Sequence, residues 1–169
     1  TGPPEGEYNV DVPPPPPTPS VSISPEQVRE IAAASLPTLR ETVRQNGGSS
    51  PCPDDPLAMC PHEGYPKYGF NNEQELELAT VGTPAEQFTL WPAALKGFQP
   101  GQALEELVTP THHWMVPVTV NGEGRNEIEV GWSDGTWQET MCCAQPSISP
   151  NLMAVQQQYA GRSTPVRTI

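Results

Sequence analysis

Three runs of alternating apolar residues between His112 and Cys143 constrain the fold more than any other stretch. Apolar residues at every second position are typical of strands with one buried face. They are Trp114, Val116, Val118 and Val120 in the first run, Ile128, Val130 and Trp132 in the second, and Trp137, Met141 and Cys143 in the third. Asn121-Gly122 and Asp134-Gly135 separate the runs and tolerate the positive φ of tight hairpin turns. The stretch predicts a three-stranded antiparallel meander.

Helical patterns flank this meander. Ser24-Pro25-Glu26-Gln27 has the residues of a capping box, and apolar residues follow at helical spacing up to Asn46. Pro37 lies inside this helix and predicts a kink or two short helices. Further helices are expected over 72–79, where Asn72 would be the cap, over 102–108 and over 149–159, and further strands over 86–91 and 165–169. Residues 49–70, rich in proline and glycine, predict an irregular loop held by its cysteines. We expect an α+β fold in which an antiparallel three- to four-stranded meander packs against one or two helices.

The first 23 residues predict an extended tail, and residues 24–169 a single domain. Proline fixes φ and lacks an amide donor, so the tail should adopt a polyproline II conformation without regular pairing. Its candidate partner-binding residues are Pro13, Pro14, Pro15, Pro16, Pro17 and Pro19. A stiff segment loses little entropy on docking, which favours a strap that lies on a neighbouring protein. A semi-rigid spacer is the alternative.

Four cysteines, Cys52, Cys60, Cys142 and Cys143, form an even set. We favour two disulfides that tie the 52–60 loop to the end of the last strand, each worth about 2–4 kcal/mol. A Cys52–Cys60 bond with a vicinal Cys142–Cys143 bond, a zinc site and free or redox-active thiols are the alternatives. With only two lysines and a start at Thr1, the set favours an extracellular, cell-surface or periplasmic protein after signal-peptide removal, or a fragment.

Composition bears on the partners. The formal net charge is −12, which disfavours nucleic acid and anionic lipid surfaces. No apolar run is long enough to span a membrane. We therefore expect protein partners.

The sequence predicts no catalytic residue, cofactor site or metal site. Asp54, Asp55, His62 and Glu63 could surround a hard cation, but an acidic surface loop is the favoured interpretation. His112 and His113 should face opposite sides of a strand and cannot share an ion. Glu127 and Glu129 share a face that we expect to be exposed, with ordinary pKa values. Nucleophile-elbow, phosphate-loop and dinucleotide motifs are missing, so we do not expect an enzyme.

The four tryptophans, Trp91, Trp114, Trp132 and Trp137, allow two interpretations. Three of them fall on the predicted buried face, which favours core packing. A sugar-binding platform is the alternative.

One resemblance extends over roughly residues 70 to 160. A helix, Val81-Gly82-Thr83-Pro84, a strand, a short helix, and then Trp114-Met115-Val116-Pro117-Val118 leading to Asn121-Gly122 follow one another. This order resembles uncharacterised secreted bacterial domains of the PepSY-like α+β kind. The resemblance implies a non-enzymatic exported module and carries no functional residues with it.

The expected function is a non-enzymatic structural or accessory subunit of an exported assembly at the cell surface or envelope. The proline-rich strap would dock it to other protein subunits of that assembly, and a second copy of the chain is one candidate for such a subunit. A monomeric secreted or surface-tethered binding module with the tail as spacer is the alternative, and a small thiol- or metal-dependent enzyme is the second alternative.

Overall fold

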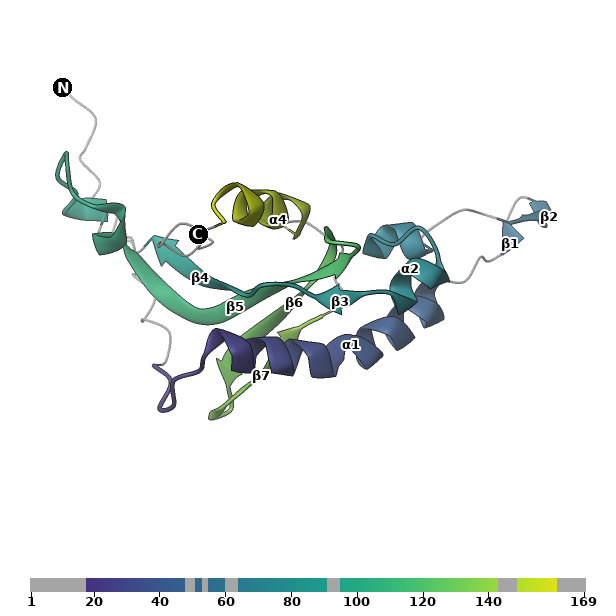
Figure 1. Ribbon diagram of the computed structural model, residues 1–169, viewed down its shortest axis with the longest axis horizontal. Helices are drawn as coiled ribbons and strands as arrows, with labels where there is room; N and C mark the ends of the chain where they lie inside the picture. The colour runs from purple at the N-terminus through teal and green to yellow at the C-terminus, as the bar shows by residue number, and fades with distance from the viewer. Residues whose placement is uncertain are drawn as a thin grey trace, which may run out of the picture.

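The computed structural model describes residues 18–47, 51–52, 55–59, 64–90, 95–142 and 149–160, without the side chains of 47, 51–52, 55–59, 104 and 149. A curled antiparallel sheet lies between helices on its two faces (Figure 1). The tail up to Pro17, the strand expected over 165–169, and Asp54, Cys60, His62, Glu63, Trp91 and Cys143 lie outside the described residues. The α+β prediction is confirmed.

The sheet is built around one long strand. Both β3 (Thr80–Val81) and β4 (Ala85–Leu90) pair with β5 (Val108–Val120), and β6 (Glu123–Ser133) and β7 (Thr136–Met141) follow on its other side. Asn121 and Gly122, and then Asp134 and Gly135, have the positive φ values that the hairpins require. These strands confirm the predicted meander and its two turns.

The long strand β5 begins earlier than the sequence predicts. The helix expected over 102–108 is a single 3-10 turn, Leu104–Glu106, and pairing with β4 starts at Val108. The pairing shifts between Glu86 and Phe88, opposite His112, which has a φ of 60°. Such a bulge bends the strand. The regular strand geometry that begins at Trp114 is therefore interrupted at His112.

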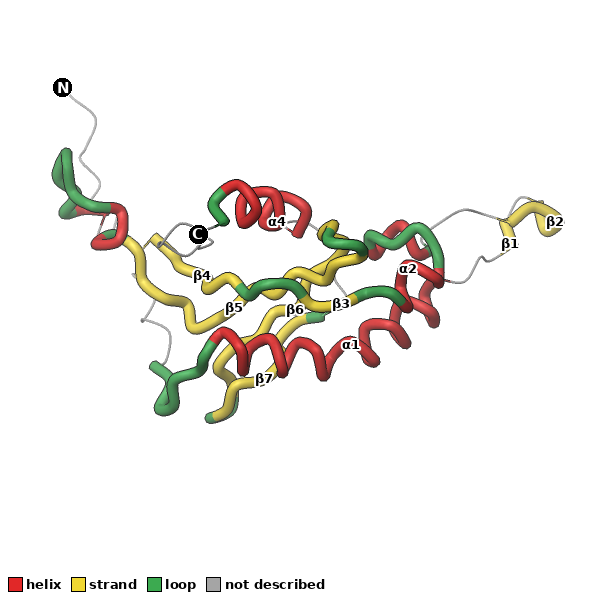
Figure 2. The backbone as a smooth tube through the Cα atoms, in the orientation of Figure 1, coloured by secondary structure: helices red, strands yellow, loops and turns green. Residues whose placement is uncertain are grey.

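The helix α1 (Pro25–Gly47) covers one face of the sheet (Figures 1 and 2). The predicted capping box forms, since the backbone N–H of Gln27 donates to Ser24 Oγ at 3.2 Å and that of Ser24 donates to Gln27 Oε1 at 3.0 Å. Pro37 does not divide the helix into two. Ala33 and Pro37 lie on the solvent side, where water can bind the carbonyl that Pro37 leaves without a donor.

The hydrophobic core lies between α1 and the sheet. Its fully buried members are mostly β-branched on the sheet and small or aliphatic on the helix. They include Val28, Ala32, Leu39 and Val43 from α1 and Val116, Val118, Val120, Ile128 and Val130 from the sheet. The predicted burial of the valines and of Ile128 in the first two strands is confirmed, whereas Trp114 and Trp132 on the same face are partly exposed.

One arginine fastens α1 to the segment before the sheet. The short helix α2 (Glu73–Glu77) starts at its cap Asn72, as predicted, and Asn72 accepts a hydrogen bond from Glu75 N. Arg40 of α1 donates to the carbonyl oxygens of Leu76, Glu77 and Ala79 at 3.0–3.2 Å. A guanidinium thus satisfies carbonyls that the end of α2 leaves open.

The opposite face of the sheet carries α4 (Ser149–Gln158) (Figure 2). Leu152 packs with Ala85 and Met115 in a small second core. Glu127 on this face is only 2% exposed, so our expectation of a solvent-exposed face is wrong. The residues that follow the meander return over this face, which strand alternation alone does not reveal.

The segment around the first two cysteines contains a short strand pair. An irregular loop was expected, but β1 (Pro51–Cys52) pairs with β2 (Asp55–Met59). A 3-10 turn, Tyr65–Tyr68, leads from there to α2. None of the helices in the described ranges is long and apolar enough to cross a membrane.

Candidate functional site

Three tryptophans mark one end of the sheet, on the face that α1 covers. They are Trp114 of β5, Trp132 of β6 and Trp137 of β7, and each is partly exposed. Trp132 and Trp137 are cross-strand partners whose rings meet edge to face, with centroids 5.7 Å apart. The three share the predicted face, but they lie at its rim, and valine and isoleucine fill its centre. We call this region the aromatic end.

Residues 18–24, which we call the root of the tail, lie against the aromatic end. The indole Nε1 of Trp137 donates to the carbonyl oxygen of Val21 at 2.7 Å. Ile23 packs on the core, and Ser24 caps α1. Three separate interactions therefore hold the root, although Val21 itself is 60% exposed.

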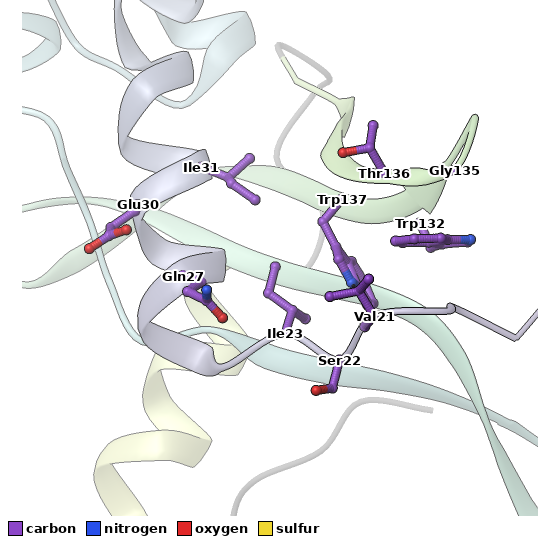
Figure 3. A pocket seen from close by; sticks show the side chains of 10 residues that line it. All are labelled: Val21, Ser22, Ile23, Gln27, Glu30, Ile31, Trp132, Gly135, Thr136 and Trp137. Carbon is purple, nitrogen blue, oxygen red and sulfur yellow. Dashed lines mark hydrogen bonds between the residues drawn. The ribbon is translucent and has the colours of Figure 1, made fainter.

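A first hollow of about 360 Å³ opens between the root, the start of α1 and the β6–β7 hairpin (Figure 3). Figure 3 shows Ile23 and Ile31 on one side and the two indoles on the other. The complete lining is Val21, Ser22, Ile23, Gln27, Glu30, Ile31, Trp132, Gly135, Thr136 and Trp137. Glu30 is its single charged residue, so the hollow suits a neutral, largely apolar ligand better than an anion.

A second hollow, of about 270 Å³, shares the wall made by Ser22, Ile23 and Trp137. The other lining residues are Thr18, Pro19, Glu86, His112 and Trp114. The beginning of the described chain therefore lies in the second hollow. Trp137 separates it from the first.

A polar cluster lies on the face of the sheet that carries α4. Glu129 of β6 accepts hydrogen bonds from His113 Nδ1 at 2.9 Å and from Thr140 Oγ1 at 2.6 Å, and a weak one from Gln87 at 3.5 Å. These donors come from β5, β7 and β4. One carboxylate thus links side chains of four of the five strands.

Electrostatics follow from these bonds. Burial works to raise the pKa of Glu129, but the hydrogen bonds from Thr140 and His113, the charge of His113 and the bond from Gln87 outweigh it. The pKa of Glu129 therefore lies below its usual value, and the carboxylate is ionised at neutral pH.

Gly131 makes room for the histidine. A Cβ at this position would lie 2.8 Å from the imidazole of His113. The ring therefore lies over a strand position that only glycine leaves open. The Glu129 carboxylate thus orients this imidazole and joins side chains from three other strands.

Among the predictions for the other candidate site residues, the structure confirms some and contradicts others. The two imidazoles lie apart as expected, with His112 in the second hollow and His113 on the opposite face. Glu127 and Glu129 are buried and partly buried, so their predicted exposure is wrong. The acidic cluster at 54–63 has no described side chain. In the described residues no group of three metal-ligating side chains occurs.

Only one cysteine side chain, that of Cys142, lies within the described part, where it packs against the main core. The two-disulfide arrangement involves Cys52, Cys60 and Cys143, whose side chains are outside it. The arrangement therefore stays a prediction.

Sequence reasoning missed both the root and the Glu129 cluster. The root joins residues 116 positions apart through one indole N–H, and no local pattern indicates such a bond. For the cluster, the available signal was Gly131 inside a strand, on the same face as the polar residues Glu129 and Ser133 two positions away on either side. Glycine there suggests the close approach of another group.

Comparisons with protein-family models, curated proteins and solved structures find no match for this chain. The PepSY-like resemblance stays a prediction.

Proposed function

We propose that the protein is a non-enzymatic structural or accessory subunit of an exported assembly, docked to neighbouring subunits through its proline-rich N-terminal strap. The observation that carries this proposal is the fixed root, which the Trp137–Val21 hydrogen bond holds on the domain. The export component rests on the even cysteine set and the low lysine content.

A fixed root matters because of what the tail contains. The run Pro13–Pro17 ends directly before Thr18, the first described residue of the root. Polyproline is stiff and extended, so a run that starts from a fixed point leaves in a narrow range of directions. A strap must present itself to its partner in one orientation, whereas a spacer needs only length.

A length-matched replacement separates these roles. Replacing Pro13–Pro17 with five serines keeps the length of the tail but removes its stiffness and its proline rings. We expect the full chain with this change to remain folded, because no described core residue lies there, and to be lost from high-mass complexes in its native cells. Retention in those complexes would contradict the strap. Replacing Pro3-Pro4 with serines is the matched control for general changes of the tail.

A surface-tethered binding module is the second candidate. The first hollow favours it, since its volume lies within the range of about 300–1,000 Å³ for ligand sites. A module with a spacer tail would tolerate the five serines and would lose function when Trp132 is replaced.

A further inference from the structure

We propose that the first hollow receives the Pro13–Pro17 run of a second copy of this chain, so that copies join head to tail. This inference rests on the proposed strap function and names its partner. The inference connects two features of the same chain, a hollow lined by tryptophan and a proline run.

The chemistry of the hollow suits a proline run. Proline-rich segments dock in aromatic-lined grooves, where flat rings pack on pyrrolidine faces and the preformed helix loses little entropy. Trp132 and Trp137 supply the rings, and Ile23 and Ile31 supply an apolar floor. The volume of about 360 Å³ accommodates part of an extended run and is too small for a folded partner surface.

The net charge of the chain favours the uncharged proline run, over the other parts of the molecule, as the segment that docks on a second copy. Two copies with a net charge of −12 repel each other, so contact is least unfavourable through uncharged segments. The run Pro13–Pro17 is uncharged, and Glu30 is the single charged residue that lines the hollow. The docking segment and its site thus avoid most of the repulsion.

The described position of the root favours another copy over the chain's own run. Thr18, which follows Pro17, lies in the second hollow, on the far side of Trp137. Five prolines span about 15 Å at about 3.1 Å per residue and do not reverse direction within the run. To reach the first hollow, the chain's own run would have to bend around the wall of Ser22, Ile23 and Trp137.

The resulting contact is heterologous, since a hollow on one copy meets a run on the next. Each joined pair still has one open hollow and one open run, so association continues into rings or filaments. A subunit of an extended assembly needs this property.

Complementation between two variants of the full chain tests the inference. Trp132→Ala removes one ring from the first hollow, while Trp137, the donor to Val21, and all lining residues of the second hollow stay unsubstituted. The five-serine variant removes the run. In sedimentation equilibrium over a concentration series, we expect the wild type to increase in mass and each variant alone to stay monomeric. An equal mixture should form one-to-one heterodimers, because one variant offers the run and the other the hollow.

Two further variants keep the test independent of folding. Thr136→Arg places bulk at an exposed position of the hollow and should also abolish self-association, which covers the case in which Trp132→Ala unfolds. Leu78→Ala removes an apolar side chain that is 54% exposed but lies beside α2, and it should associate like the wild type.

Any one of three results would overturn the inference. These are a monomeric wild type, association of the hollow variants at wild-type strength, and a mixture that forms no heterodimers. The proposed function fails separately. If the purified chain is monomeric but the five-serine variant is still lost from native complexes, the strap docks on a different protein and only the self-contact is wrong.

Discussion

Trp137 on the last strand holds Val21 at the start of the described chain through a hydrogen bond of 2.7 Å between the indole Nε1 and the backbone carbonyl. This bond ties the root of the tail to the rim of the sheet. The acceptor is a backbone carbonyl, which every residue has, so the sequence around Val21 gives no sign of this hydrogen bond. Only substitution of the donor, Trp137, can remove the bond.

Trp137→Phe should release the root while it keeps an aromatic ring against Trp132. We expect a loss of about 1 kcal/mol in the free energy of unfolding, the usual net worth of one hydrogen bond. Proteolysis within residues 18–24 should become faster, as measured by mass spectrometry of early fragments. Trp132→Phe is the matched control, since Trp132 donates no hydrogen bond within the described part of the chain. Equal cleavage rates in both variants would show that the bond does not hold the root.

Arg40→Ala should destabilise the domain more than Arg44→Ala, one turn further along the same helix. Arg40 binds three backbone carbonyls at the end of α2, and charge-assisted bonds of this kind contribute about 1.5–3 kcal/mol. Arg44 instead makes ion pairs with Glu73 and Glu77 that are largely solvent-exposed, where pairs contribute about 0–1 kcal/mol. Urea unfolding of both variants measures the difference, and equal losses would contradict it.

Val118→Asp should unfold the domain. Val118 is fully buried in the middle of β5, in the core that β5 forms with α1. An unpaired carboxylate there costs several kcal/mol, which is comparable with the whole stability of a small domain. Circular dichroism of the purified variant checks the outcome. Leu78→Asp, at an exposed position, should remain folded.

The sequence predicts the centre of the fold well because strand periodicity and turn chemistry agree there. In β5, Val116, Val118 and Val120 are buried as the alternation predicts, although Met115 and Thr119 on the other face are buried as well. Asn121-Gly122 and Asp134-Gly135 have the backbone that their residue types favour. The capping box at Ser24 and the cap at Asn72 are equally local and equally well predicted. Each of these features depends on a few adjacent residues.

Prediction fails where distant residues decide. In β7 the alternation predicts that Met141 is buried with Trp137, but the pairing shifts between Glu129 and Val130 and Met141 is partly exposed. Glu127 is buried because other parts of the chain cover its face, and the strand pattern contains no information about them. A bulge and a covering helix both lie beyond the range of period-two arguments.

The oxidation state of the four cysteines tests whether the protein is exported. We expect the native protein to contain two disulfides among Cys52, Cys60, Cys142 and Cys143, and no zinc. Intact mass after alkylation, with and without prior reduction, counts the free thiols. Alkylation of all four thiols in the native protein under oxidising conditions would contradict both the disulfides and the export that they support.

The Glu129 cluster should make stability depend on pH in the acid range. Its pKa in the folded protein lies below the ordinary value of 4.5, so folding favours the ionised carboxylate. The resulting stabilisation is present above the unfolded-state pKa and is lost as the pH falls through the folded-state value. Glu129→Gln keeps the size of the side chain but cannot ionise. At pH 7 we expect the wild type to be more stable by about 2 kcal/mol, the scale of hydrogen bonds to a charged group.

Below about pH 5, this difference between wild type and Glu129→Gln, measured by urea unfolding, should shrink steadily as the pH falls. Glu75 also has a lowered pKa, chiefly through hydrogen bonds from Asn71, but it is present in both proteins and cancels in the difference. Gly131→Ala should imitate the loss at neutral pH, because its Cβ displaces the imidazole of His113 from Glu129. A difference that does not change between pH 7 and pH 3 would show that the carboxylate acts through its shape and not through its charge.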